Sequence, residues 1–129
     1  MGKVAFIFPG QGAQFVGMGK DFYDNFPVAK KTFDRADESL GFSLSKMCFE
    51  GPDDELIKTE NTQPAILATS IAIYNVLEEM GVNFDYTAGL SLGEYTALVS
   101  ARALEFEESL PLVQKRGKLM QETVPLGKG

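Results

Sequence analysis

The sequence predicts an α/β fold built around parallel strands. Two short apolar segments, residues 4–8 and 86–90, are each followed by a glycine-containing turn, and stretches with helical spacing of apolar residues lie between and after them. Because parallel strands need a long crossover connection, this alternation indicates a parallel sheet. Sheets usually have about 4–6 strands. We therefore expect residues 1–129 to be the N-terminal part of a larger α/β unit.

The first strand, residues 4–8, is apolar throughout and is followed by Pro9-Gly10, so it is predicted to be buried. Four helical segments are expected before the second strand, at residues 21–26, 27–40, 43–50 and 62–80. In the last of them Thr62 is expected to be the N-cap, Pro64 to lie in the first turn, and Gly81 to end the helix.

The second strand, residues 86–90, is also predicted to be buried. A helix is expected at residues 92–100, directly after it, and a further helix at residues 106–124, stopped by Pro125. Repeats, low-complexity tracts and linkers are not evident, so the chain is treated as part of one domain.

Composition narrows the possible functions. The net charge of −6 argues against general nucleic-acid binding, and no apolar run reaches the roughly 20 residues that span a membrane. Cys48 is the one cysteine, so an internal disulfide is impossible, which fits a cytoplasmic protein. The sequence contains no histidine, which excludes a Ser-His pair and a histidine-ligated metal within these residues. We expect no metal site.

Residues 89–93, Gly-Leu-Ser-Leu-Gly, match the nucleophile-elbow pattern G-x-S-x-G. The pattern is short, but here it lies between a predicted strand and a predicted helix, as an elbow requires. Small residues at Gly89 and Gly93 allow the strand and helix to approach closely. The elbow makes Ser91 the candidate nucleophile; the alternative is a Gly-Ser turn without chemistry.

The loop at residues 9–14 follows the first strand and is rich in glycine and glutamine. It is not a P-loop, because Gly17 is followed by Met18, and it lacks the third glycine of a dinucleotide fingerprint, where Phe15 stands. Such a loop at the C-terminal end of a strand can supply a backbone N–H to an oxyanion hole.

Together these segments resemble the acyltransferase family that includes malonyl-CoA:acyl carrier protein transacylases and the acyltransferase domains of fatty-acid and polyketide synthases. The resemblance rests on residues 10–14 (Gly-Gln-Gly-Ala-Gln), 61–65 (Asn-Thr-Gln-Pro-Ala), 89–95 (Gly-Leu-Ser-Leu-Gly-Glu-Tyr), Arg116-Gly117 and 124–129. The motifs follow in order along essentially the whole chain.

The resemblance implies a role for each matching residue. Ser91 would carry the malonyl group as an ester, and the backbone N–H groups of Gln11 and Leu92 would form the oxyanion hole. Arg116 would bind the malonyl carboxylate.

The substrate pocket is also implied by the resemblance. Gln63 would line it, and so would Leu90, which stands where the family usually has a histidine beside the serine. Because that histidine is not the family's general base, its replacement is expected to change the polarity of the pocket and not to abolish activity.

The resemblance further implies the reaction and its participants. A malonyl group would pass from malonyl-CoA to the thiol of acyl carrier protein in fatty-acid biosynthesis, with the coenzyme A thioester as substrate and no cofactor. The fold would be a hydrolase-like subdomain. The family's base histidine and its small ferredoxin-like subdomain would lie beyond residue 129, so a missing C-terminal part would be a partner of this chain, which alone would be inactive.

Two other interpretations remain open. A patatin-like serine hydrolase also uses G-x-S-x-G, with an aspartate as base, but no aspartate here precedes a glycine as its Asp-Gly pair requires. A non-catalytic module that binds acyl-CoA or a partner chain would suit a chain without histidine. A downstream histidine in a family-like segment would favour the enzyme.

Overall fold

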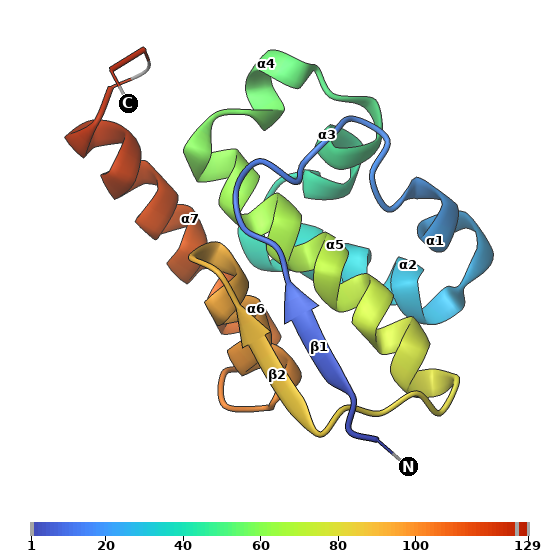
Figure 1. The fold of residues 1–129 in the computed structure, drawn as a ribbon. Helices are drawn as coiled ribbons and strands as arrows, with labels where there is room; N and C mark the ends of the chain where they lie inside the picture. Colours follow the sequence, from blue (N-terminus) through green and yellow to red (C-terminus); the bar gives the residue numbers. More distant parts are fainter. Residues whose placement is uncertain (1, 126, 129) are drawn as a thin grey trace.

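A computed structural model describes residues 2–125 and 127–128 of the chain. Strands β1 (Ala5–Phe8) and β2 (Tyr86–Gly89) pair in parallel, with Ala5 opposite Tyr86 and Phe8 opposite Gly89. Figure 1 shows the two strands side by side, with the helices gathered behind and beside them. The predicted α/β fold with a parallel pair is confirmed.

Seven helices occur among the described residues, and most match the expected segments to within one or two positions. They are α1 (Lys20–Asn25), α2 (Pro27–Leu40), α3 (Leu44–Glu50), α4 (Asp53–Leu56), α5 (Thr59–Glu79), α6 (Leu92–Ser100) and α7 (Phe106–Thr123). The short helix α4 was not predicted. It begins directly after Pro52 and has acidic residues in its first turn, which favours a helix N-terminus.

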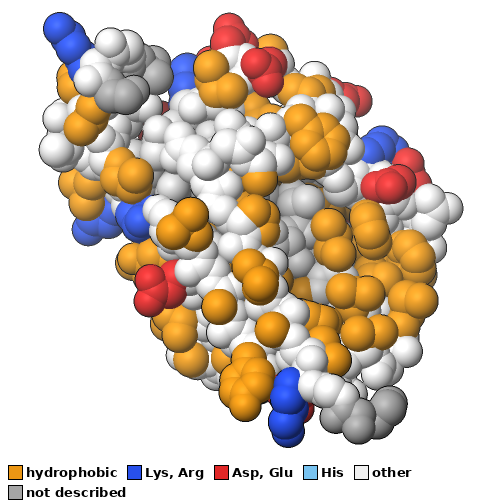
Figure 2. Space-filling model, in the orientation of Figure 1, with side chains coloured by type: hydrophobic (Ala, Val, Ile, Leu, Met, Phe, Trp, Pro, Cys, Tyr) orange, Lys and Arg blue, Asp and Glu red, His pale blue; other side chains and the backbone are white. Residues whose placement is uncertain are grey.

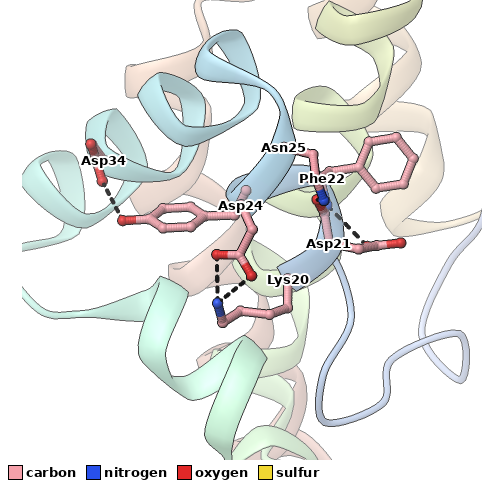
Figure 3. Close-up of polar contacts among 7 residues, drawn as sticks. Lys20, Asp21, Phe22, Asp24, Asn25 and Asp34 are labelled. Atoms are coloured by element: carbon pink, nitrogen blue, oxygen red, sulfur yellow. Dashed lines mark hydrogen bonds and ion pairs between the residues drawn. The ribbon is translucent and has the colours of Figure 1, made fainter.

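Interactions between residues close in sequence stabilise α1 and set the two ends of α2. Lys20 Nζ donates to both carboxylate oxygens of Asp24, at 2.5 and 2.6 Å, along one face of α1 (Figure 3). Pro27 occupies the first position of α2, where its missing N–H costs nothing. Gly41, with φ of 76°, ends α2 in the left-handed conformation that glycine adopts easily.

Helix α5 begins three residues earlier than predicted. Thr62 is therefore not the N-cap: its hydroxyl donates back to the carbonyl oxygens of Leu56, at 2.5 Å, and Lys58, at 3.1 Å. Pro64 lies inside the helix and not in its first turn. Threonine bonds to a preceding carbonyl as readily as it caps a helix, so the sequence signal misplaced the start. The prediction that Gly81 ends the helix is confirmed, because it follows the C-cap with φ of 83°.

The core lies between α5 and the helices that contact it, chiefly α2, α6 and α7. Large side chains from all four helices are fully buried there: Phe33, Leu67, Leu92, Leu110 and Val113. Each contributes roughly 1.5–3 kcal/mol by leaving water. Among the described residues, no helix combines the length and apolar character needed to cross a membrane.

The strand pair has one covered and one bare face. Phe6 and Phe8 point toward Tyr74 of α5, with ring centroids 6.0 and 6.5 Å away. The alternate side chains Ile7 and Tyr86 are 78% and 62% exposed. The prediction of two buried strands is therefore wrong: Phe8 is the one buried residue of β1, and no residue of β2 is buried, because the described helices cover only one face. Figure 2 shows apolar side chains along this open face.

Candidate active site

Ser91 lies at the sharp turn between β2 and α6. Its backbone has φ of 53° and ψ of −114°, a conformation that costs a non-glycine residue about 1–3 kcal/mol. Backbone hydrogen bonds hold the turn: the Gly93 N–H donates to the Leu90 carbonyl over 2.8 Å, and the Glu94 N–H donates to the Ser91 carbonyl over 3.1 Å. The predicted strand–serine–helix arrangement is therefore present.

Glycines let three main-chain segments touch at this turn. A Cβ at Gly93 would lie 2.2 Å from the carbonyl oxygen of Phe8 in β1, and one at Gly89 would lie 2.0 Å from the carbonyl carbon of Gly93. A Cβ at Gly10 would lie 2.7 Å from the Leu90 carbonyl oxygen. Distances below 3.0 Å are sterically excluded, so each position requires glycine, and the loop after β1 is held against the elbow.

The two residues whose backbone N–H groups are predicted to form an oxyanion hole, Gln11 and Leu92, lie in segments that meet at the turn. Leu92 is the first residue of α6, so its N–H has no acceptor within the helix. Gln11 follows Gly10, the residue in contact with the Leu90 carbonyl. The fold thus brings the loop after β1 and the start of α6 to the same side of the sheet, although the two are far apart in sequence.

Arg116 reaches the serine from α7. Its Nη2 donates to Ser91 Oγ over 3.1 Å, and its Nη1 donates to Gln63 Oε1 over 2.6 Å. The guanidinium carbon also lies 5.2 Å from the ring centroid of Tyr95, within range of a cation–π interaction. The next residue, Gly117, lets α7 pack closely against the start of α5, because a Cβ there would lie 2.5 Å from the Thr59 carbonyl oxygen.

Gln63 is fully buried and connects Arg116 to the loop after β1. Its Nε2 donates to Gln11 Oε1 over 3.4 Å, and Gln11 Nε2 donates to Thr59 Oγ1 over 3.3 Å. Thr59 in turn donates to Gln121 Oε1 over 3.2 Å. Sequence reasoning identified Gln11 and Gln63 but missed Thr59 and Gln121, because neither belongs to a local motif.

Leu90, the remaining candidate residue, has a side chain that is 78% exposed beside Ser91. Its carbonyl is part of the turn, whereas its side chain lies on the open side of the molecule. Glu94 is exposed on α6. The structure therefore brings together Ser91, Leu92, Gln11, Gln63 and Arg116, and places Leu90 at their outer edge.

A cleft of about 840 Å³ opens next to Arg116. It runs between α7 and the start of α5, and Gln11 and Thr59 form part of its wall. Lys115 and Arg116 are its positively charged residues, and Leu112, Leu119 and Met120 give it an apolar side. This combination suits a ligand that carries both negative charge and apolar surface.

Cys48 is not a competing nucleophile. Its side chain is fully buried, and burial raises the pKa of its thiol to about 12, so it stays protonated and unreactive near neutral pH. Among residues 2–125 and 127–128, no three histidine, cysteine, aspartate or glutamate side chains gather as they would around a metal ion.

Comparison with known proteins agrees with this geometry. Residues 5–129 match the family described as acyl transferase domain. A malonyl CoA-acyl carrier protein transacylase from Bacillus subtilis (strain 168) is 54% identical over 129 residues, which are all of this chain and 41% of that protein.

Solved structures of malonyl transacylases are also similar to this chain. The malonyl CoA-acyl carrier protein transacylase from Clostridium perfringens superposes with a TM-score of 0.93 and 51% identity, over 98% of this chain and 40% of that one. A malonyl-transacylase in complex with a type II PKS acyl-carrier protein superposes with a TM-score of 0.91 and 48% identity, over 96% and 40% of the two chains.

The chain thus spans about two fifths of the length of these relatives. The family match covers nearly all of it, and the strained serine, the close glycine contacts and the arginine beside the serine lie within the matched residues. The chain belongs to the acyl transferase domain family.

Proposed function

We propose that a protein containing this chain transfers a malonyl group from malonyl-CoA to the thiol of acyl carrier protein. The observation that carries the proposal is the 3.1 Å contact between Arg116 Nη2 and Ser91 Oγ, which puts a carboxylate-binding group beside the nucleophile. Relatives from Bacillus subtilis and Escherichia coli are malonyl CoA-acyl carrier protein transacylases, and a structure from Vibrio cholerae is an acyl carrier protein S-malonyltransferase, which supports the same substrates.

The reaction has two steps, acylation of Ser91 and transfer of the acyl group to the carrier protein. Ser91 Oγ attacks the thioester carbonyl, the carbon–sulfur bond breaks, and coenzyme A leaves as a thiol that takes up the serine proton. The thiol of the carrier protein then attacks the ester, which regenerates the serine hydroxyl. The backbone N–H groups of Gln11 and Leu92 stabilise the oxyanion in both steps. The thioester is the substrate, and no cofactor is required.

Arg116 selects the acyl group. Its guanidinium leaves Ser91 Oγ to meet the free carboxylate of the malonyl group with two parallel hydrogen bonds, while the contact with Gln63 holds its other nitrogen. Leu90, exposed beside Ser91, makes the surroundings of the nucleophile less polar than a histidine would. The apolar side of the 840 Å³ cleft receives the remainder of the substrate.

The chain alone does not turn over malonyl-CoA in this proposal. A serine hydroxyl needs an adjacent base, and the sequence contains no histidine. Carboxylates with a pKa of about 4 are weak bases at neutral pH. The base comes from outside these residues, and the chain forms part of a hydrolase-like subdomain that a smaller subdomain completes.

Mass spectrometry after incubation with malonyl-CoA tests the acylation site. The chain is assayed alone and with the remaining sequence of the Bacillus subtilis relative added in trans. We expect a malonyl adduct on Ser91 in the combined sample, no adduct in Ser91→Ala, and no steady transfer to carrier protein by the chain alone. An adduct on Cys48 or another serine would overturn the assignment. Binding without any adduct would favour a non-catalytic module.

A further inference from the structure

A continuous series of hydrogen bonds runs from Arg116 through two glutamines to the end of the same helix. Arg116 Nη1 donates to Gln63, Gln63 to Gln11, Gln11 to Thr59, and Thr59 to Gln121, over 2.6, 3.4, 3.3 and 3.2 Å. We call these five residues the amide relay. It leaves α7 at Arg116, crosses α5 and the loop after β1, and returns to α7 at Gln121.

The charge of Arg116 fixes the direction of every bond in the amide relay. A guanidinium has donors and no acceptor, so Gln63 must turn its carbonyl oxygen toward it. The Gln63 NH₂ group then faces Gln11, which must present its own carbonyl oxygen. Gln11 consequently offers its NH₂ group to Thr59. Because the Thr59 hydroxyl accepts this bond, its single proton is free to donate to Gln121 Oε1.

The loop after β1 depends on this series for its attachment to α5. Within the loop, Gly12 N–H donates to Gln14 Oε1 over 2.7 Å, and Ala13 N–H donates to the Gly10 carbonyl over 3.4 Å. Both hydrogen bonds described between residues 10–14 and α5 are made by the side chain of Gln11. The position of its backbone N–H is thus coupled to Gln63 and Thr59.

We propose that the amide relay is a positioning device in which Arg116 sets the orientation of Gln63 and Gln11, and Thr59 and Gln121 hold its far end. Thr59 and Gln121 are positioning residues: they act on the loop after β1 through Gln11 and do not contact the reacting atoms. The proposal deepens the proposed function, because it couples the carboxylate-binding arginine to the oxyanion donor.

Side-chain and backbone amide signals of the 129-residue chain test the relay by NMR without any substrate. Thr59→Val keeps the shape of the side chain but removes the hydroxyl, so the side-chain amide signals of Gln11 and Gln63 and the Gln11 backbone signal should shift. Thr59→Ser should restore them. Thr123→Val is the matched control, because that hydroxyl donates to the Leu119 carbonyl over 2.8 Å, outside the relay.

A second pair of variants tests the direction of the bonds. Gln121→Glu should be tolerated, because a carboxylate still accepts from the Thr59 hydroxyl. Gln63→Glu should shift the Gln11 signals, because a carboxylate next to Arg116 has no N–H to offer Gln11 Oε1. Glutamine signals unmoved in Thr59→Val, or equal shifts in the two glutamate variants, would overturn the proposal. Since no acyl substrate is involved, such a failure is distinct from failure of the proposed acyl transfer.

Discussion

Arg116 donates a hydrogen bond to the hydroxyl oxygen of Ser91 over 3.1 Å, although the two residues are 25 positions apart. Arg116 lies in α7, and Ser91 lies at the turn between β2 and α6. The same guanidinium is held at 2.6 Å by the buried Gln63. In the proposed reaction, this cation would meet an acidic acyl group carried by the serine. The contact would then link the identity of the acyl group to the site of attack.

Arg116 should determine the preference for malonyl over acetyl groups. In a chimera that continues this chain with the remaining sequence of the Bacillus subtilis relative, Arg116→Ala should lower kcat/KM for malonyl-CoA by about 30- to 1000-fold, which corresponds to about 2–4 kcal/mol for a lost charge-assisted pair. Acetyl-CoA has no free carboxylate, so its kcat/KM should be spared or improved.

The Arg116→Lys variant is the control for charge. Lysine keeps the charge but cannot form two parallel hydrogen bonds, so its activity with malonyl-CoA should fall between those of the native chimera and Arg116→Ala. Equal losses with malonyl-CoA and acetyl-CoA in Arg116→Ala would mean that the arginine supports the fold and that the carboxylate is bound elsewhere.

Gly93→Ala should destabilise the chain although alanine is the better helix former. The added Cβ would lie 2.2 Å from the Phe8 carbonyl oxygen, and neither main chain can move without disturbing the strand pair or the elbow. Overpacking of this kind costs typically 1–3 kcal/mol, more than the roughly 1 kcal/mol that alanine gains over glycine within a helix. The melting temperature should fall.

Gly2→Ala serves as the matched control, because a Cβ at Gly2 would meet nothing within 4 Å. Its melting temperature should equal that of the native chain. If Gly93→Ala melted as high as the native chain, the close approach of α6 to β1 described above would be wrong.

Ile7→Lys should reduce self-association of the chain. Ile7 is 78% exposed on the bare face of the strand pair, beside main-chain edges that can pair with another molecule. A lysine there places a charge on that face. Sedimentation at increasing concentration should show the native chain shifting to larger species and the variant remaining smaller.

Met80→Lys replaces another exposed apolar side chain, at the end of α5, where Met80 is 66% exposed. It should associate as the native chain does. A native chain that stays monomeric at high concentration would show that the bare face does not drive association.

Cys48 should make the stability of the chain fall at alkaline pH. Burial raises the pKa of its thiol from 9.0 to about 12, so the unfolded chain loses this proton first. A raised folded-state pKa gives stability that is fully present below about pH 9 and is lost as pH rises toward 12. The slope reaches at most about 1.4 kcal/mol per pH unit.

Urea denaturation of the native chain and of Cys48→Ala at several pH values isolates this effect. The native chain should lose stability more steeply above pH 9 than the variant, which lacks the thiol. Parallel pH profiles for the two proteins would mean that the thiol is accessible to solvent in the folded chain.

The sequence predicted those helix bounds that depend on residues at the helix ends. The bounds of α2 follow from Pro27 and Gly41, and α6 begins directly after Ser91 as the elbow pattern requires. Other features depend on what lies nearby in space. Thr59 and Gln121 meet across 62 positions, and neither carries a motif. Ile7 belongs to an apolar strand, but the pattern does not reveal which neighbours cover each face.

The glycines at 10, 89 and 93 place the serine by contacts between main chains and not between side chains. Main-chain atoms are the same whatever the side chains, so these contacts fix the position of Ser91 without depending on the side chains of the surrounding helices. The same contacts limit how this site can be transferred to another protein. A serine grafted onto another strand–helix turn would need glycine at all three equivalent positions, on two segments distant in sequence, before a catalytic partner could be placed beside it.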